Sequence, residues 1–364
     1  MIEKYTPGKF SVGAGSMMLK YSMINLCMSS VNPPFNPGDK VNVYINLESV
    51  LNNLFLFRDW NTSIEYHKER VALEVESSIL NLVGHYKAFF DYKGIDVKVF
   101  LYMNDLEKSP QEMEVYNKFY REYYYNKYMV DPKFSRMGEL MKNVIIPEVK
   151  LILTYIPDCY LITSTSFDSS VIPKVITDAT GVRGVVVSAD LFDSLYMFNT
   201  MMTVLLVRRH YHNLNVASNV EEVVKMIIKR DTEMNMTIFA NELYYRLLLS
   251  VRGSKIRNIK AAKWFGFTKL LNAINVYLEK GIVLSKASSL ESIIEIFPPK
   301  YREDIRSAFE CTSIDHQVEL MSDADKEMIM EQIIDKTDLA SVEALNNQRF
   351  LEFPINLQNL IPRR

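Results

Sequence analysis

The chain has 364 residues, 48% of them hydrophobic, which is enough for a full apolar core in one large domain or two moderate ones. Its formal net charge of −2 excludes a generally basic surface for nucleic acids, so any such binding must come from a local patch. The N-terminus has no apolar run of about 18 residues and no charged-then-apolar leader, which predicts a soluble, cytoplasmic protein without membrane contact.

Residue usage adds two expectations. The cysteines Cys27, Cys159 and Cys311 are far apart and lack CxxC spacing, which indicates small buried side chains in a reducing compartment. Glycine is scarce, with 12 residues, whereas Tyr, Phe and Met number 21, 19 and 19. A composition rich in Tyr, Met, Asn and Ile favours a virus or phage of low-GC coding habit, whose protein would act in the host cytoplasm.

Short apolar runs of β-branched and aromatic residues predict buried strands, in chain order at 41–47, 97–103, 159–165, 184–190 and 202–209. Helices are predicted between these strands, at about 47–53, 63–92, 107–150 and 170–181. Gly181 is expected to end the last of these helices, and Pro173 fits its first turn.

The alternation of strands and helices predicts an α/β body at 40–215, with a mainly parallel central sheet and helices on both faces. Residues 1–39 contain Gly, Ser and Pro clusters and are predicted to form an N-terminal arm. From 216 to 345 the pattern is helical only, which predicts a second, helical module. The tail at 346–364 has extended character and is expected to pack back on the body.

Acidic residues follow the predicted strands, where ligands of parallel sheets bind. Several carboxylates converging on one rim can hold Mg²⁺ for phosphodiester hydrolysis. The alternative is that these acids are helix N-caps and loop residues. Because the first strand offers the neutral Asn46 instead of an acid, the set contains few carboxylates for binding two metal ions. The candidate carboxylates are Glu48, Asp105, Asp168, Asp190 and Asp193.

Residues 247–271 predict two helices joined by a short, Gly-containing turn that is rich in Lys and Arg. Backbone amides at the start of a helix, surrounded by cations, form a seat for phosphate. The candidate nucleic-acid contacts of this segment are Arg252, Gly253, Ser254, Lys255, Arg257, Asn258, Lys260, Lys263, Gly266 and Lys269.

A second candidate surface is the aromatic helix predicted at 116–128, in which Lys118, Arg121 and Lys127 alternate with tyrosines and a phenylalanine. Such a surface can stack bases and hold phosphates. The alternative is amphipathic packing, because the residues at 116, 120, 123 and 127 share one helix face.

The order of elements over about 40–364 resembles the five-prime nuclease family, the flap endonucleases and phage 5′–3′ exonucleases with a PIN-like fold. By this resemblance, Asn46 stands where the first strand carries a metal-binding Asp, and Asp105 is the acid after the second strand. The resemblance also implies a helical arch around 107–150, which admits a single strand. Only Asp168 is present of the about two acids that the family has before the next helix. In the family's Asp-x-Asp pair after the following strand, Asp190 matches the first position, Phe192 stands at the second, and Asp193 is displaced by one residue.

The basic turn resembles the helix–three-turn–helix motif of that family, which places this motif in the C-terminal helical module. Gly253, Asn258, Ile259 and Gly266 match the motif, whereas Ser254 and Arg257 replace its two metal-binding Asp residues. A guanidinium at about 4 Å would repel Mg²⁺ by several kcal/mol at intermediate dielectric. The closing segment from 346 resembles the family's last strand.

The sequence therefore predicts a catalytically inactive 5′-nuclease-like protein, with no metal and no cofactor. We expect it to bind DNA, or a protein complex of viral replication or transcription, through the basic turn. A first alternative is an active Mg²⁺- or Mn²⁺-dependent 5′-nuclease whose rearranged site uses the candidate carboxylates. A second alternative is a structural subunit of a viral particle or polymerase assembly, with an aromatic protein interface.

Overall fold

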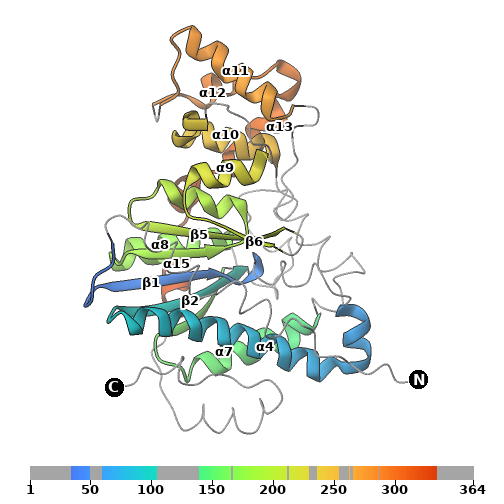
Figure 1. The fold of residues 1–364 in the computed structure, drawn as a ribbon, viewed down its shortest axis with the longest axis vertical. Coiled ribbons are helices and arrows are strands. Elements are labelled where there is room, and N and C mark those ends of the chain that lie inside the picture. Colours follow the sequence, from blue (N-terminus) through green and yellow to red (C-terminus); the bar gives the residue numbers. More distant parts are fainter. Residues whose placement is uncertain are drawn as a thin grey trace.

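The computed structural model describes residues 34–49, 60–104, 139–164, 167–210, 213–228, 236–253, 262, 265–285 and 287–333. Its centre is a six-stranded sheet in the order β3-β2-β1-β4-β5-β6 (Figure 1). The strands are β1 (Lys40–Asn46), β2 (Asp96–Asn104), β3 (Cys159–Ser164), β4 (Gly184–Ser188), β5 (Met202–His210) and β6 (Asn213–Ala217). No described helix combines the length and the apolar content needed to cross a bilayer.

All neighbouring strands from β3 to β5 pair in parallel, and only β6 runs antiparallel, beside β5. The predicted fold class, a mainly parallel sheet with helices on both faces, is confirmed. β6 was not predicted, because its five residues contain no continuous apolar run and derive their stability from the hairpin with β5. β6 ends two residues beyond 215, the predicted end of the α/β body. The predicted division of the chain into arm, body, helical module and tail stays a prediction.

Helices cover both faces of the sheet, which is why its strands are buried along most of their length rather than at alternate residues. Along β1, Val43 and Ile45 belong to one core with the helices α4 (Trp60–Tyr92) and α7 (Ile146–Leu153). Tyr44 points to the opposite face, toward α8 (Ile172–Thr180) and α9 (Val220–Ile228). On that face the rings of β1, β2 and β3 stack, with centroids 5.4 Å apart for Tyr44–Phe100 and 5.1 Å for Phe100–Tyr160.

The predicted helices are present wherever the structure describes them. α8 follows the 3₁₀ turn η3 (Ser169–Val171), has Pro173 in its first turn and ends at Gly181, whose φ of +66° favours glycine. α4 includes the predicted helix and has a kink at His67. α7 follows the π-helical turn η2 (Met141–Ile145). Most of the predicted arch, the N-terminal arm and the tail lie outside the described residues. The two described cysteines, Cys159 and Cys311, are buried and form no disulfide.

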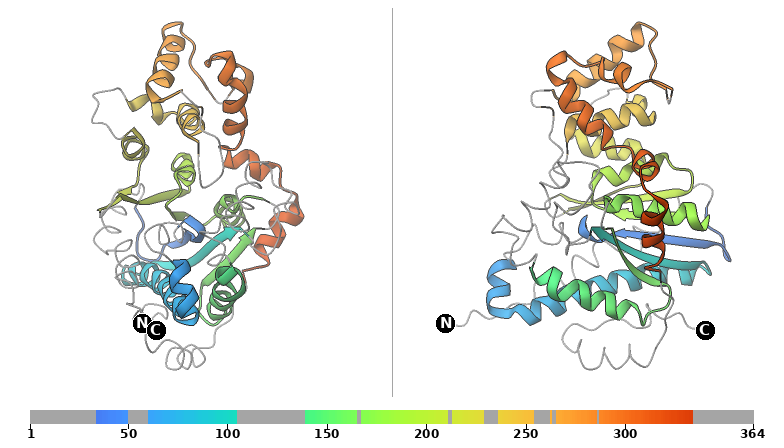
Figure 2. Two further views of the ribbon diagram at one scale, coloured as in Figure 1. Left: turned by 90° about the vertical axis from the view of Figure 1, so that its right-hand side faces the viewer. Right: turned by 180° about the vertical axis from the view of Figure 1, so that it is seen from behind.

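A helical module follows the sheet and lies at one end of the molecule (Figure 1). It comprises η5 (Met236–Ala240), α10 (Glu242–Arg252), α11 (Phe267–Glu279), α12 (Leu290–Ile294) and α13 (Pro299–Glu310). The chain then returns to the body through α14 (Ile314–Glu319) and α15 (Asp323–Met330), seen in orange-red in Figure 2. α14 contacts η3 and α8, and α15 contacts α8 and the edge strand β3.

A buried acid in α4 leads to a prediction about pH. Burial raises the pKa of Glu74 from 4.5 to about 7. The folded state thus holds the Glu74 proton more tightly than the unfolded chain, so the stability contribution is present below pH 4.5 and lost as pH rises through about 7. We expect Glu74→Gln to raise the urea midpoint at pH 8 and to leave it nearly unchanged at pH 4. Each unit of the pKa difference between the folded and unfolded states corresponds to roughly 1.4 kcal/mol in the free energy of unfolding. Glu69→Gln, on the exposed face of α4, is the control and should change neither midpoint.

Candidate functional site

The carboxyl ends of β1, β2, β3 and β4 lie along one rim of the sheet, as parallel pairing requires. Asp193 is the most deeply buried carboxylate of this rim, with 0% of its surface exposed. It lies in the 3₁₀ helix η4 (Leu191–Phe198) that follows β4. Its Oδ2 accepts hydrogen bonds from Asn46 Nδ2 at 2.6 Å, Ser188 Oγ at 2.5 Å and Tyr102 OH at 3.2 Å.

This arrangement joins three strands through one acid. Asn46 ends β1, Tyr102 lies near the end of β2 and Ser188 ends β4. Asn46 also accepts a hydrogen bond from the Ser49 backbone N–H at 2.9 Å, which fixes the orientation of its amide and directs Nδ2 at Asp193. Three donors from three strands therefore converge on one carboxylate oxygen, Oδ2 of Asp193.

Asp168 and Asp190 act as N-caps, the alternative considered for the acids of the rim. Asp168 Oδ1 accepts from Ser170 N at 2.8 Å at the start of η3. Asp190 Oδ1 accepts from Phe192 N at 3.0 Å at the start of η4. In each case the carboxylate satisfies a backbone donor that the first turn of a helix leaves open.

Glu48 lies on the same rim and approaches the amide of Asn104, with Asn104 Nδ2 3.4 Å from Glu48 Oε2. The Asn104 amide also donates to Ser169 Oγ at 3.1 Å and accepts from Ser169 N at 3.0 Å. Asn104 thus connects the ends of β1 and β2 to η3. Asp105, the next residue, lies outside the described residues.

The described part of the chain contains no group of three or more His, Cys, Asp or Glu side chains placed to hold a metal ion. The three donors to Asp193 all reach the same oxygen, Oδ2, and one of them is the amide N–H of Asn46. Two members of this network, Tyr102 and Ser188, were not singled out from the sequence. A tyrosine inside a buried apolar run is a usable signal, since its hydroxyl needs a partner.

The basic turn is anchored at both ends. α10 ends at Gly253, whose φ of +67° is favourable only for glycine, and Ala262 N donates back to Val251 O at 3.1 Å. Phe265 then packs into the module, with ring centroids 5.2 Å from Phe297 and 5.1 Å from Tyr301. The residues between these anchors lie outside the described part of the chain, as do those of the aromatic helix; of the candidates these are Ser254, Lys255, Arg257, Asn258, Lys260, Lys263, Lys118, Arg121 and Lys127.

α11 begins at Gly266, which provides no side-chain cap, and its first turn contains Lys269 and no acid. The later helices α12, α14 and α15 are instead capped by the serines Ser289, Ser313 and Ser322. Arg252, by contrast, is directed toward the protein, since its Nη1 donates to Ile227 O at 3.4 Å. The start of α11 therefore combines backbone N–H groups without a side-chain acceptor and a nearby cation, the pattern that suits an anion.

A scan of the sequence against protein-family models and curated proteins gives no match. The chain is similar to solved 5′-nuclease structures. One is bacteriophage T5 flap endonuclease in a pseudo-enzyme–product complex with DNA and metal ions, with 12% identity, 80% of this chain and 98% of the other covered, and a TM-score of 0.45. A second is T5 5′-exonuclease with bound zinc, at 12% identity and a TM-score of 0.47 over the same shares of the two chains.

A third similar structure is the catalytic core of Rad2 in complex with a DNA substrate, with 13% identity, 82% of this chain and 93% of the other covered, and a TM-score of 0.33. Because all three TM-scores are below 0.5, this likeness assigns neither an activity nor a ligand to the chain. The strand order and the contacts of the rim residues, by contrast, are observed directly in this structure.

Proposed function

We propose that the chain is a 5′-nuclease-like protein that binds DNA without cutting it, as part of viral replication or transcription. The observation that supports this most is the state of Asp193, a buried carboxylate that accepts three hydrogen bonds from Asn46, Tyr102 and Ser188. Metal-dependent hydrolysis of a phosphodiester needs carboxylate oxygens that bind the metal ions, whereas phosphate binding needs only backbone amides and cationic side chains.

The basic turn is the proposed DNA contact. The hydrogen bond from Ala262 N to Val251 O holds the two described ends of this segment together, and we assign the phosphate contacts to the cations of the sequence between them, among them Lys255 and Arg257. The uncapped start of α11 adds backbone N–H groups next to this loop. DNA is the ligand we propose for this surface, because its phosphates are the anions that backbone amides and Lys or Arg side chains bind.

A salt titration of binding to duplex DNA tests the proposal. We expect binding at low salt that weakens steeply as salt rises, since each phosphate contact contributes about 0.9 to the slope of log K against log salt. The double variant Lys255→Ala/Arg257→Ala should lower that slope by about 2 and weaken binding by about tenfold or more at low salt. Lys93→Ala/Lys142→Ala removes the same charge from exposed positions of the α/β body and should change neither quantity. Absence of binding at low salt, or binding without a salt slope, would exclude the DNA-binding proposal.

An active nuclease is the second candidate, because Glu48, Asp168 and Asp190 do come together on one rim as buried acids. Cleavage of a flap substrate in Mg²⁺ or Mn²⁺ separates the two candidates. We expect no cleavage. If the protein cleaves the substrate and Asp190→Ala abolishes the cleavage, the chain is an active nuclease and the proposal of an inactive protein is wrong.

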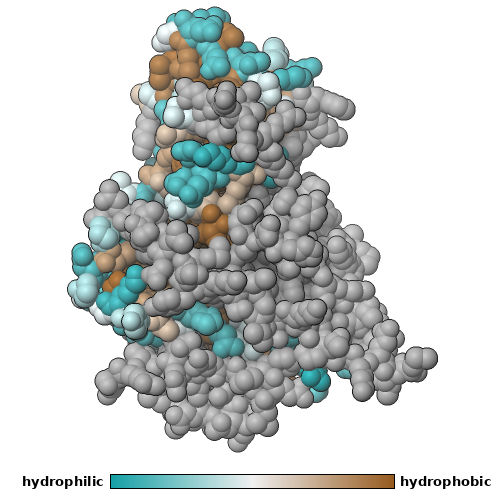
Figure 3. All heavy atoms as spheres, in the orientation of Figure 1, coloured by the Kyte–Doolittle hydropathy of each residue, from teal (hydrophilic) through white to brown (hydrophobic). Residues whose placement is uncertain are grey.

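An apolar surface at the far end of the helical module is relevant to the third candidate, a structural subunit. Val276, Ile282 and Val283 are 46%, 44% and 63% exposed, and apolar atoms are visible at this end in Figure 3. Apolar surfaces of this kind mark protein interfaces when they are extensive. A chain without DNA binding that assembles through this surface would favour the structural candidate, and Val283→Asp would then prevent assembly.

A further inference from the structure

α10 contains two neighbouring buried tyrosines whose hydroxyls have different partners. Tyr244 and Tyr245 are 3% and 0% exposed. The hydroxyl of Tyr244 stays within the helical module, where it accepts from Leu284 N at 3.0 Å. The hydroxyl of Tyr245 reaches η4 instead and is hydrogen-bonded to Ser194 Oγ. Tyr245 therefore joins α10, the helix that leads into the basic turn, to the segment that contains Asp193.

The other contacts of Ser194 determine the direction of this hydrogen bond. The Ser194 hydroxyl has one hydrogen, which it donates to Leu191 O within η4. Tyr245 must therefore be the donor to Ser194. Burial raises the pKa of Tyr245 well above its ordinary value, so the hydroxyl keeps the proton that it donates. Its ring also packs against Phe198 of η4, with centroids 5.4 Å apart.

Side chains fix η4 to the sheet and to the helices beside it. η4 is a 3₁₀ helix of eight residues, longer than the three or four that this geometry usually sustains. Asp193 attaches it to β1, β2 and β4, and the Tyr196 hydroxyl attaches it to η3 by donating to Ser170 O. Ser194 thus offers Tyr245 an acceptor whose position the body of the protein defines.

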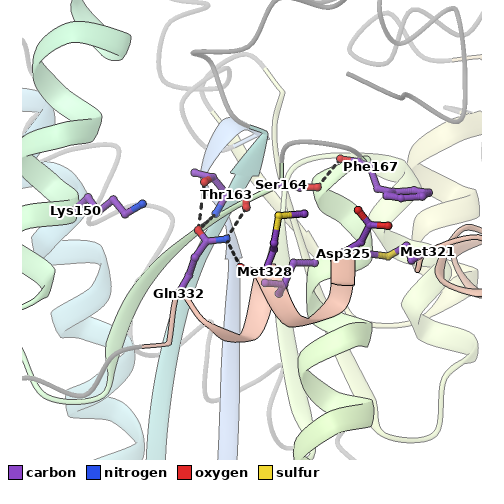
Figure 4. Close-up of a pocket in the computed structure, with 9 residues that line it drawn as sticks. Lys150, Thr163, Ser164, Phe167, Met321, Asp325, Met328 and Gln332 are labelled. Carbon is purple, nitrogen blue, oxygen red and sulfur yellow. Dashed lines mark hydrogen bonds between the residues drawn. The ribbon is translucent and has the colours of Figure 1, made fainter. Parts of the chain in front are cut away.

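The chain has a separate attachment to the body after the helical module. α15 lies against β3, where the Gln332 side chain exchanges two hydrogen bonds of 2.9 Å with the backbone of Thr163 (Figure 4). This contact involves neither α10 nor the basic turn. Loss of the Tyr245 hydroxyl would therefore leave the module attached, and α10 could change its orientation without unfolding.

We propose that the Tyr245 hydroxyl positions the basic turn for binding duplex DNA, an inference that rests on the proposed function. Tyr245 lies about two helical turns before Gly253, where α10 ends. A longer hydrogen bond of 3.4 Å, from Arg252 Nη1 to Ile227 O, restrains the last turn of α10 more weakly. With α10 held at Ser194, the cations of the turn keep one arrangement, so less conformational freedom is lost on binding. Tyr245 is a positioning residue, because it is buried and contacts no DNA itself.

DNA binding by Tyr245→Phe tests the positioning role. We expect this variant to bind duplex DNA about fivefold more weakly, because the freedom of α10 must then be lost on binding. The slope of log K against log salt should stay the same, since every Lys and Arg is retained. The variant should fold, because Ser194 still donates to Leu191 O and no buried donor is left unsatisfied.

Tyr244→Phe is the matched control for this measurement. It removes a buried hydroxyl from the same helix and leaves the Leu284 N–H without its acceptor, so it should destabilise the protein at least as much as Tyr245→Phe. Its affinity for duplex DNA should nevertheless equal that of the unmodified protein, because the contact between α10 and η4 is intact. Unchanged affinity in Tyr245→Phe, or an equal loss of affinity in both variants, overturns the proposal.

Hydrogen exchange tests the same contact without DNA. Ala262 N donates to Val251 O at the end of α10, so its exchange rate reports how often this end of the turn opens. We expect Tyr245→Phe to speed exchange of the Ala262 amide by about fivefold or more, and Tyr244→Phe to speed exchange at Leu284 instead.

The exchange result also separates this inference from the proposed function. If the unmodified protein does not bind duplex DNA, the proposed function fails, and faster exchange at Ala262 in Tyr245→Phe would still show that Tyr245 holds the turn in place. Unchanged exchange at Ala262 in a folded Tyr245→Phe protein contradicts the positioning role, whether or not the chain binds DNA.

Discussion

Asp193→Ala is expected to lower the free energy of unfolding by about 3–5 kcal/mol, the largest effect of any single substitution considered. The change leaves Asn46 Nδ2, Ser188 Oγ and Tyr102 OH without their shared acceptor in the interior. Each buried donor left unsatisfied costs about 1–3 kcal/mol, and the removed carboxylate leaves a void. Urea unfolding followed by circular dichroism measures the loss, which is a large fraction of the roughly 5–15 kcal/mol of a typical domain.

The matched control is Asp178→Ala. Asp178 is 53% exposed and pairs with Lys174 at 2.9 Å within one helix, so its loss should cost less than about 1 kcal/mol. Equal losses from the two variants would show that the network around Asp193 does not stabilise the fold.

The isosteric Asp193→Asn variant connects this result to function. If Asp193 is held by protein donors, the melting temperature of the variant should fall by the same amount with and without Mg²⁺. The fall is expected because the new amide places an N–H donor against the N–H donor of Asn46. If Asp193 is a metal ligand, Mg²⁺ should stabilise the original protein and not the variant, because only a state that binds the ion gains from it. A Mg²⁺-dependent melting temperature that Asp193→Asn removes would therefore contradict the proposed inactive site.

Gly184→Ala is expected to lower the free energy of unfolding by about 2–3 kcal/mol, the second largest loss of stability. A Cβ at this position would lie 2.5 Å from Met202 Sδ and 2.6 Å from Tyr44 Cε2. Tyr44 cannot yield easily, because its ring stacks on Phe100 and its hydroxyl is 2.9 Å from Thr177 Oγ1. β1 and β4 would have to separate, which disturbs the centre of the sheet.

Gly266→Ala is the control for this substitution. A Cβ at Gly266 meets no atom within 4 Å, and the backbone there is extended with φ −83°. We expect a change of no more than about 1 kcal/mol, as for other weak N-cap positions. Thermal denaturation compares the two variants, and a Gly184→Ala protein as stable as Gly266→Ala would refute the packing argument.

The elements that were predicted correctly are those whose signal is local. β1, β2 and β4 are continuous apolar runs, because both faces of the sheet are covered and no residue needs to be polar. The short, mixed sequence of β6 has no such signal, and its pairing with β5 depends on the hairpin. Of the five predicted rim acids, the four that the structure describes lie on this rim because parallel strands end together; Asp105 lies outside the described residues.

The sequence alone determined the order of the elements, the parallel sheet and the identity of the acids at its rim, since periodicity and residue type act over a few neighbours. Only the tertiary structure showed which atoms those acids contact. Asn46 and Asp193 are 147 residues apart, and Gln332 meets Thr163 across 169 residues. Such pairs are invisible to local patterns, because they depend on how folding brings distant segments together and on which polar atoms then remain to be satisfied.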